Sequence, residues 1–309
     1  MQEFEFFLEK NIFALFNLLR NKKYIPDSYI PFYICDPKRR HIHKASIRDR
    51  ILHQAVYRIL GPIFDKQFFH DSYSSRIEKG THKGVKRLFS FIRKESKNYK
   101  RQAFVLKCDI SKFFDSIDHQ ILQNLIKSKV NDPDTLGLID IILKSFEKSK
   151  GKGLPLGNVT SQLFGNIYMH PFDYFAKHIL KAKHYARYCD DFVIVSYDYQ
   201  YLSQCTPLIK IFLEDKLKLS LHPKKVSIRK IGQGIDFLGY VSLPQATVLR
   251  TKTKRRILRK IIKLKEDLNN KVIDKKRFDQ SLQSYLGILK HCRGHKIEKE
   301  IKRVILSIT

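Results

Sequence analysis

The sequence is poor in the residues that mark disulfide-bonded, redox-active or membrane-spanning proteins. It contains no tryptophan, two methionines and five cysteines, and the cysteines form no Cys-x-x-Cys pair. An odd, scattered set of cysteines is typical of a reducing compartment. No segment approaches the roughly 18 consecutive apolar residues of a membrane-spanning helix, and the first residues lack the basic-then-apolar order of a signal peptide. The sequence therefore predicts a cytoplasmic protein that crosses no membrane.

Two common ligand motifs are also missing or incomplete. No GxxxxGKS or GxxxxGKT phosphate-binding loop occurs in the chain. The segment His291-Cys292-Arg293-Gly294-His295 contains candidate zinc ligands, but the sequence has no distant partner to complete a tetrahedral site. Neither a P-loop enzyme nor a zinc protein is therefore predicted.

Acidic residues are scarce relative to basic ones. The chain has 30 Asp and Glu residues against 60 Lys and Arg, which gives a formal net charge of +30, and the excess is spread along its whole length. A surplus of this size indicates a polyanionic partner, favouring a nucleic acid over an anionic membrane surface or a merely soluble basic coat. With 43% apolar and 12% aromatic residues, the chain can also bury a substantial core.

Three aspartates are notable against this basic background. Asp109 ends the apolar run 104–108, and Asp190 and Asp191 lie adjacent between two further apolar runs. Two carboxylates about 4 Å apart repel by roughly 4 kcal/mol at an effective dielectric near 20, so converging aspartates require a cation. Magnesium binds through carboxylates and substrate phosphates, and two ions stabilise both oxygens of an in-line displacement at phosphorus. The pattern predicts two-magnesium chemistry of the polymerase or nuclease type.

Local patterns place these aspartates at strand ends. Residues 104–108 predict a buried strand that ends at Asp109, and Asp118 is a candidate N-cap of the helix that follows. Residues 185–188 and 192–196 predict a hairpin whose tip carries the two adjacent aspartates. An aspartate pair at a turn is common by itself. Here it follows, in order along the chain, an aspartate at the end of a strand and a glycine-containing loop that leads into a helix, and this order makes the pattern specific.

Further helices are predicted from apolar spacing. Residues 47–64 indicate an amphipathic helix, and a Gly/Pro loop at 153–158 leads into a helix that Thr160 or Ser161 can cap and Pro171 should kink or restart. At the N-terminus, the spacing predicts a packing helix with one buried apolar stripe, formed by Phe4, Phe7, Leu8, Ile12, Leu15 and Leu19.

Over roughly residues 40–300, the order of these motifs resembles that of reverse transcriptases. The matching segments are Arg48 and Arg50 for the first block of the family, residues 72–82 for the second, 109–118 for the third, 188–191 for the YxDD box, 219–226 for a lysine-bearing block and 235–240 for the hairpin that grips the primer. Residues 284–292 also resemble the C-terminal block of the family.

One departure from the common pattern narrows the resemblance. Many members carry Gln before the loop glycine and Pro after the following Ser, whereas this chain has Leu156 and Gln162 at those positions. The run LPLGNVTSQLFGNIY resembles the reverse transcriptases of diversity-generating retroelements, which are related to group II intron enzymes. The resemblance implies loose nucleotide selection, because Leu156 cannot make the hydrogen bond that Gln makes to the nucleotide sugar.

The resemblance implies a role for each matched residue. Asp109, Asp190 and Asp191 would hold two Mg²⁺ ions, and Lys225, with Lys224 as second choice, would protonate the leaving pyrophosphate. The nucleotide-binding residues would be Arg48, Arg50, Arg76, Phe114, Gly157 and Gln162. Of these, the three arginines would neutralise the triphosphate, while the ring of Phe114 would lie beneath the sugar and favour deoxynucleotides. Phe237, Leu238 and Gly239 would position the primer.

The expected fold is the α+β right-hand polymerase fold. It would comprise N-terminal helices and fingers at 1–102, a palm with an antiparallel sheet at 103–245 that includes a fingers element around 120–160, and a helical thumb at 246–309. In the thumb, Ile257, Ile261, Leu264 and Leu268 recur at helical spacing and should pack inward. The other faces would present cations to a duplex: Arg255, Arg256, Arg259, Lys260, Lys263 and Lys265.

The expected function is that of an RNA-directed DNA polymerase that copies a template RNA into cDNA with errors at adenines. Its partners would be the template RNA, the RNA/DNA duplex, deoxynucleotides and a small basic accessory protein. Two alternatives stay open. One is a reverse transcriptase of phage defence or abortive infection that polymerises without a template. The other is a nucleic-acid-binding module with a silent site, against which the presence of all three aspartates argues.

Overall fold

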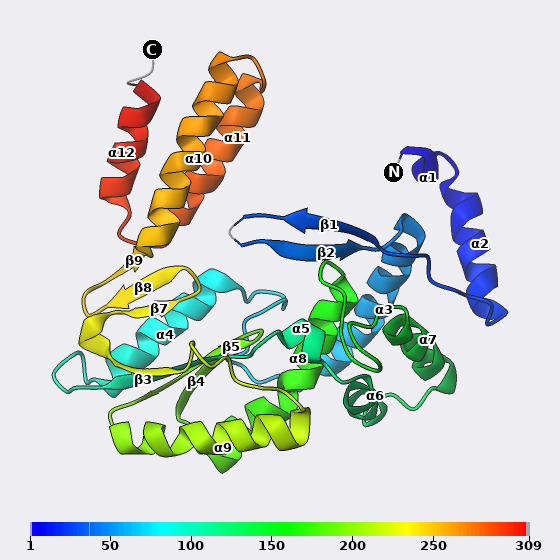
Figure 1. The fold of residues 1–309 in the computed structure, drawn as a ribbon, viewed down its shortest axis with the longest axis horizontal. Coiled ribbons are helices and arrows are strands. Elements are labelled where there is room, and N and C mark those ends of the chain that lie inside the picture. The colour runs from blue at the N-terminus through cyan, green and yellow to red at the C-terminus, as the bar shows by residue number, and fades with distance from the viewer. Residues whose placement is uncertain (1, 37, 307–309) are drawn as a thin grey trace.

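The computed structural model describes residues 2–36 and 38–306, and this part of the chain forms an α+β structure (Figure 1). Its helices are α1 (Gln2–Phe6), α2 (Leu8–Arg20), α3 (Ile47–Asp65), α4 (Thr81–Glu95), α5 (Phe113–Ser116), α6 (His119–Lys127), α7 (Pro133–Lys144), α8 (Val159–Tyr174), the π-helix η1 (Phe175–Ile179), α9 (Tyr199–Leu217), the 3-10 helix η2 (Ile231–Gln233), α10 (Thr251–Asn269), α11 (Lys275–Leu289) and α12 (His295–Leu306). Among these residues, no helix has the length and apolar character needed to cross a bilayer.

The strands of the described residues form three antiparallel sheets. The first pairs β1 (Ile30–Ile34) with β2 (Arg40–Lys44). The central sheet has the order β4-β5-β3-β6, built from β3 (Phe104–Asp109), β4 (His184–Tyr188), β5 (Asp191–Ser196) and β6 (Ser227–Lys230). The third contains β7 (Ile235–Phe237), β8 (Tyr240–Leu243) and β9 (Ala246–Leu249).

The central sheet is covered on both faces because its strands alternate between two apolar clusters. Leu106 of β3 and Ile194 of β5 belong to the large cluster that includes residues of α8 and α9. Val105 and Val193, one residue away on each strand, belong to a second cluster together with Leu88 of α4. Side chains of a strand point to opposite faces in turn, so both predicted strands are buried on both sides. The predictions for 104–108 and for the hairpin strands are confirmed.

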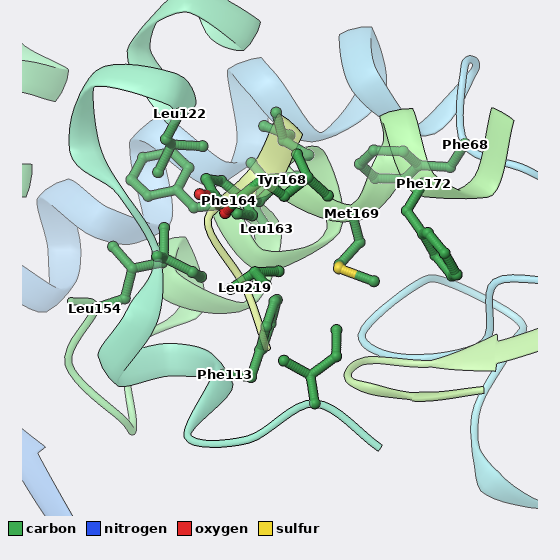
Figure 2. Packing of buried hydrophobic residues seen from close by; sticks show 14 of the residues in the cluster. Phe68, Phe113, Leu122, Leu154, Leu163, Phe164, Tyr168, Met169, Phe172 and Leu219 are labelled. Atoms are coloured by element: carbon green, nitrogen blue, oxygen red, sulfur yellow. Dashed lines mark hydrogen bonds between the residues drawn. The ribbon is translucent and has the colours of Figure 1, made fainter. Parts of the chain in front are cut away.

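Helix α8 forms the centre of the large cluster (Figure 2). Leu163, Phe164, Tyr168, Met169 and Phe172 are all buried, and Figure 2 shows them among side chains from several other segments of the chain. Burying one large apolar side chain contributes about 1.5–3 kcal/mol, so the cluster fixes α8 firmly beside the central sheet. Most positions of the helix are buried, whereas the side chains of Gln162 near its first turn and Tyr174 at its last residue are exposed.

Two details of α8 differ from the sequence predictions. The N-cap residue is Asn158, without a side-chain capping bond, whereas the Thr160 hydroxyl lies 2.5 Å from Nδ1 of buried His53. Thr160 therefore joins α8 to α3 and does not cap the helix. Pro171 lies inside the continuous helix, and the π-helix η1 follows directly after Tyr174. Two other helix predictions are confirmed. Residues 47–64 lie in α3, and Asp118 is the N-cap of α6.

The N-terminal stripe prediction is largely wrong. The helix is interrupted at Phe7, and Leu15 is the stripe residue that is buried, while Phe7, Leu8 and Ile12 are exposed. Helical spacing shows which residues share a face, but it does not show whether another element covers that face. In the described chain, much of this face is left to solvent.

The C-terminal helices form a separate small cluster with β8 and β9. Ile257 and Ile261 are fully buried there, as predicted, and Leu289 and Ile301 pack with them. Lys265 corrects the prediction of a cation offered to a duplex, because its side chain is buried and donates a hydrogen bond to the carbonyl of Ile305.

The β1–β2 hairpin points towards α10 across the central region of the molecule (Figure 1). Between its strands, the carboxylate of Asp36 forms ion pairs with Lys260 and with Arg256, whose Nε lies 3.5 Å from Oδ1. These contacts join two elements that are far apart in the sequence, on the side of the fold opposite α9.

Candidate active site

The three predicted aspartates converge because of the register of the central sheet. Asp109, the last residue of β3, pairs with Asp191, the first residue of β5. Asp190 occupies the tight turn between β4 and β5, and its carbonyl accepts a hydrogen bond of 3.2 Å from the amide of Ile110. Cys189 adopts the left-handed conformation with φ of 58°, which closes the turn. Carboxylates from two distant segments are thereby brought to one end of the sheet.

Two lysines neutralise part of this acidic cluster. The Nζ atom of Lys225 lies 2.7 Å from Oδ1 of Asp109. Nζ of Lys107 lies 3.6 Å from Oδ2 of Asp191 and donates a 2.7 Å hydrogen bond to the carbonyl of Asp236. Of Lys224 and Lys225, Lys225 is thus the one that contacts Asp109, and its role as proton donor stays a prediction.

The protonation behaviour of the aspartates shows that the cluster lacks sufficient positive charge of its own. Burial raises the pKa of Asp191 to about 7; Lys107 opposes this effect, while Asp109 and Asp190 reinforce it. Burial and the neighbouring Asp109 also raise the pKa of Asp190, although Lys225 and Arg40 lower it. Oδ1 of Asp191 is buried and has no hydrogen-bond partner among the described residues.

A divalent ion fits these observations. It would keep the carboxylates ionised and would supply the missing partner of Asp191. Among the described residues, no three His, Cys, Asp or Glu side chains are gathered closely enough to hold a metal ion by themselves. Magnesium commonly binds through one or two carboxylates and takes its other ligands from water and substrate phosphates.

Two of the residues predicted around the nucleotide, Phe114 and Gly157, lie beside α8 and the β1–β2 hairpin. Phe113 is buried against α8, where a Cβ added to Gly165 would lie 3.2 Å from its ring, and Phe114 is half-buried beside it. Gly157 has φ of 114°, and a Cβ there would lie 2.9 Å from Ile42 of β2. The loop before α8 is therefore fitted closely against the β1–β2 hairpin, and this approach requires glycine.

The predicted triphosphate arginines do not form one cluster. Arg76 is a correction: its five N–H donors bond to carboxylate oxygens of Asp65 and to the carbonyls of Asp65, Phe69 and Ser72, which leaves none for a phosphate. Sequence alone shows the positive charge but not the carbonyl groups that fold around it.

Arg48 and Arg50 lie on different faces of α3. Arg48 pairs with Asp27 at 2.8 Å and with Asp49 at 3.3 Å, so its charge is used to fix the segment before β1. Arg50 is exposed and lines a hollow with Phe4 and Leu8 of the N-terminal helices. A role for either residue in binding triphosphate stays a prediction.

The predicted primer-gripping residues form the turn between β7 and β8. Leu238 and Gly239 have φ of 52° and 90°, as a tight two-residue hairpin requires. Leu238 packs between the second and third apolar clusters, close to Gly84 of α4. Phe237 is a correction, because its side chain is 1% exposed and supports the turn from beneath instead of reaching a primer.

Sequence reasoning missed three charged residues of the site. Lys107 contacts Asp191, Arg40 of β2 acts electrostatically on Asp190, and Arg187 of β4 lies beneath the turn with its side chain fully buried. The alternation of β3 could have identified Lys107, because it lies two residues before Asp109 and thus on the same face. The basic segment Lys38-Arg39-Arg40 gave no sign of which residue would approach the aspartates.

Comparison with known proteins gives a family match over most of this region. Residues 35–242 match the family model described as reverse transcriptase (RNA-dependent DNA polymerase). Protein YkfC of Escherichia coli is 25% identical over 70% of this chain and 65% of its own length. The group II intron-encoded protein LtrA of Lactococcus lactis subsp. cremoris is 25% identical over 86% of this chain and 56% of its own length. The chain thus spans less than two thirds of these relatives.

Solved structures show the same fold at low sequence identity. Apo telomerase from Candida tropicalis, truncated from its C-terminal domain, aligns with a TM-score of 0.56 and 13% identity over 78% of this chain and 60% of the other. Telomerase from Candida albicans, in complex with a fragment of telomeric RNA, aligns with a TM-score of 0.54 and 11% identity over 84% of this chain and 55% of the other. The α+β right-hand polymerase fold predicted from the sequence is confirmed.

Proposed function

The chain belongs to the reverse transcriptase family, and on that premise we propose that it is an RNA-directed DNA polymerase that copies a template RNA by two-magnesium nucleotidyl transfer. The observation that carries the proposal is the pairing of Asp109 with Asp191, beside the turn that holds Asp190. The central sheet would be the palm, the β1–β2 hairpin part of the fingers, and α10–α12 the thumb. The partners would be template RNA, its duplex with DNA, deoxynucleotides and a small basic accessory protein.

In this mechanism, Asp109, Asp190 and Asp191 would hold the divalent ions at the end of the palm sheet. The bound ions would lower the pKa of the primer 3′-hydroxyl and stabilise charge on the transferring phosphoryl group. Lys225 donates a proton to the leaving pyrophosphate from its position beside Asp109. Gly157 and the exposed Gln162 border the nucleotide and template, and the turn at Leu238 and Gly239 positions the primer end.

We also propose the error-prone chemistry of a diversity-generating retroelement, with Leu156 as its basis. Its carbonyl accepts a 3.0 Å hydrogen bond from the amide of His43, which seats the loop on the β1–β2 hairpin. The half-buried apolar side chain cannot hydrogen-bond a nucleotide sugar. The active site would then lack one hydrogen bond to the nucleotide sugar, and a correctly placed nucleotide would be favoured less strongly over an incorrect one.

Primer extension on an RNA template, followed by sequencing of the products, tests both levels of the proposal. We expect template-dependent DNA with deoxynucleotides and magnesium, and errors concentrated opposite adenines. Uniformly accurate copying would contradict the retroelement subtype alone. Product made without a template would favour the phage-defence type, and a protein that binds nucleic acid but makes no product would favour a silent binding module.

The contact between Lys225 and Asp109 leads to a specific prediction. The change Lys225→Met should lower the single-turnover rate by about 10²-fold or more, the usual contribution of a positioned proton donor. Lys224→Met is the matched control and should change the rate little, because Lys224 is exposed and, among the described residues, the salt bridge to Asp109 is made by Lys225. Rapid-quench kinetics at saturating nucleotide would measure both. Equal rates for the two variants would remove Lys225 from the mechanism.

A further inference from the structure

Arg187 is a buried charge directly beneath the turn of the candidate active site. Its side chain is 0% exposed, as is that of Asp173 in α8. Nε and Nη2 of the guanidinium donate hydrogen bonds of 2.7 and 2.6 Å to the two oxygens of Asp173. Nη1 donates to Oδ1 of Asn166 at 3.2 Å and to the carbonyl of Cys189 at 3.0 Å. One side chain thus connects α8 to the backbone of the turn.

Stability alone does not explain such an arrangement. Burying an ion pair removes two charges from water, and well-packed apolar residues of similar volume are often at least as stabilising. Although burial on its own would lower the pKa of Arg187, the Asp173 carboxylate raises it, so the guanidinium remains charged. A permanently charged, planar donor with fixed geometry is well suited to holding an acceptor in one position.

The acceptor that Arg187 holds is the residue that bends the turn. Cys189 has a left-handed backbone with φ of 58°, which is uncommon for a residue with a side chain. On its far side, the next residue, Asp190, is held through its carbonyl by the amide of Ile110 at 3.2 Å. The turn is therefore fixed at two successive carbonyls, one by β3 and the other by Arg187.

The main chain of Arg187 extends the same connection to the loop before α4. Its amide donates to the carbonyl of Asp71 and its carbonyl accepts from the amide of Tyr73, both at 2.9 Å. The Asn166 side chain, which accepts from Arg187, donates in turn to the carbonyl of Ser74 at 2.9 Å. The turn, α8 and this loop consequently share one buried hydrogen-bond network.

We propose that Arg187 is a positioning residue of the active site: anchored by Asp173, it fixes the Cys189 carbonyl and thereby sets the orientation of Asp190 and Asp191 towards divalent ions. The inference rests on the proposed function, because it assigns those aspartates to metal binding. Arg187 touches neither substrate nor metal. Its effect is carried by the backbone of the turn.

The test compares Arg187→Lys with Tyr185→Phe in the full chain. Lysine keeps a positive charge for Asp173 but loses the planar fork that also reaches Asn166 and Cys189. Tyr185→Phe is the matched control, because it removes a 2.6 Å hydrogen bond to the same buried Asp173 without touching the turn. Binding of Mn²⁺, followed by electron paramagnetic resonance without nucleic acid, reads out the site independently of polymerisation.

We expect Arg187→Lys to weaken Mn²⁺ binding by roughly 10–100-fold, the usual cost of removing a group that orients a metal ligand. Amide hydrogen exchange should accelerate at Ile110, which bonds to the turn, and Tyr185→Phe should leave both readouts at their wild-type values. If both variants lose thermal stability equally but Arg187→Lys retains native Mn²⁺ affinity and native exchange at Ile110, the proposal is overturned.

A second variant covers the case in which Arg187→Lys does not fold. Asn166→Leu preserves the Arg187–Asp173 pair and removes one acceptor that orients Nη1, so it should weaken Mn²⁺ binding in the same direction but less. Unchanged binding in Asn166→Leu would then overturn the proposal. If the wild-type protein binds Mn²⁺ at these aspartates but makes no DNA, the proposed function is contradicted. The positioning role is then still tested by comparing the Mn²⁺ affinities of the wild type and the variants.

Discussion

Asp190→Asn should abolish nucleotide incorporation while the protein remains folded. Asparagine has nearly the same shape as aspartate, so the turn between β4 and β5 is preserved, but a negatively charged metal ligand is lost. Charge stabilisation by a bound metal is worth several kcal/mol, and each 1.36 kcal/mol is a factor of ten in rate, so we expect a loss of about 10³-fold or more. Single-turnover primer extension measures the loss directly.

The matched control for this variant is Asp215→Asn. Asp215 is exposed on α9 and the change is chemically identical, so it should leave the rate unaltered. Both proteins should show the same circular dichroism as the wild type. Appreciable incorporation by Asp190→Asn would mean that the proposed metal centre is assigned to the wrong carboxylates.

Asp191→Asn should stabilise the metal-free protein even though it also inactivates it. The pKa of Asp191 is raised from 3.8 to about 7, mainly by burial. The folded state therefore holds this proton more tightly than the unfolded state. The resulting stability is present in full below the unfolded value and is lost as the pH rises through about 7, by an amount on the order of 4 kcal/mol. Asparagine is neutral at every pH and avoids this loss.

Urea unfolding with a chelator present, at about pH 5 and about pH 8, measures the effect. The free energy of unfolding of Asp191→Asn should exceed that of the wild type by more at the higher pH, because histidines whose pKa is lowered by burial, such as His53, His170 and His184, act equally in both proteins and cancel in this difference. Magnesium added at the higher pH should restore wild-type stability, because a ligand that binds only the folded state stabilises it by mass action. An equal difference in stability between the two proteins at both pH values would show that the carboxylate does not experience the burial described above.

The positions of the three aspartates could be predicted because they depend on short-range patterns. An apolar run that ends in aspartate, and a second run interrupted by two aspartates, indicate strand ends, and antiparallel pairing brings such ends together. The residues beneath the site could not be predicted in this way. Arg187 contacts Asp173 and Asn166, which lie 14 and 21 residues away on a helix whose orientation depends on the packed core.

The errors have a common physical origin as well. The charge of Arg76 is evident in the sequence, but the carbonyls of Phe69 and Ser72 that bind it appear only when the loop is folded. The sequence predicts that Lys265 faces a duplex and that Phe237 positions the primer, whereas tertiary packing buries both side chains. In each case, the local pattern identifies the chemical group and the surrounding fold determines what that group can contact.

Asp36 joins the β1–β2 hairpin to α10 through ion pairs that can break and re-form. Exposed ion pairs contribute about 0–1 kcal/mol each, so thermal motion can break this contact. The carboxylate of Asp36 pairs with two cations of the proposed thumb, Arg256 and Lys260. These cations would otherwise be available to a phosphate backbone. If the chain binds nucleic acid as proposed, a phosphate backbone would compete with Asp36 for these two cations.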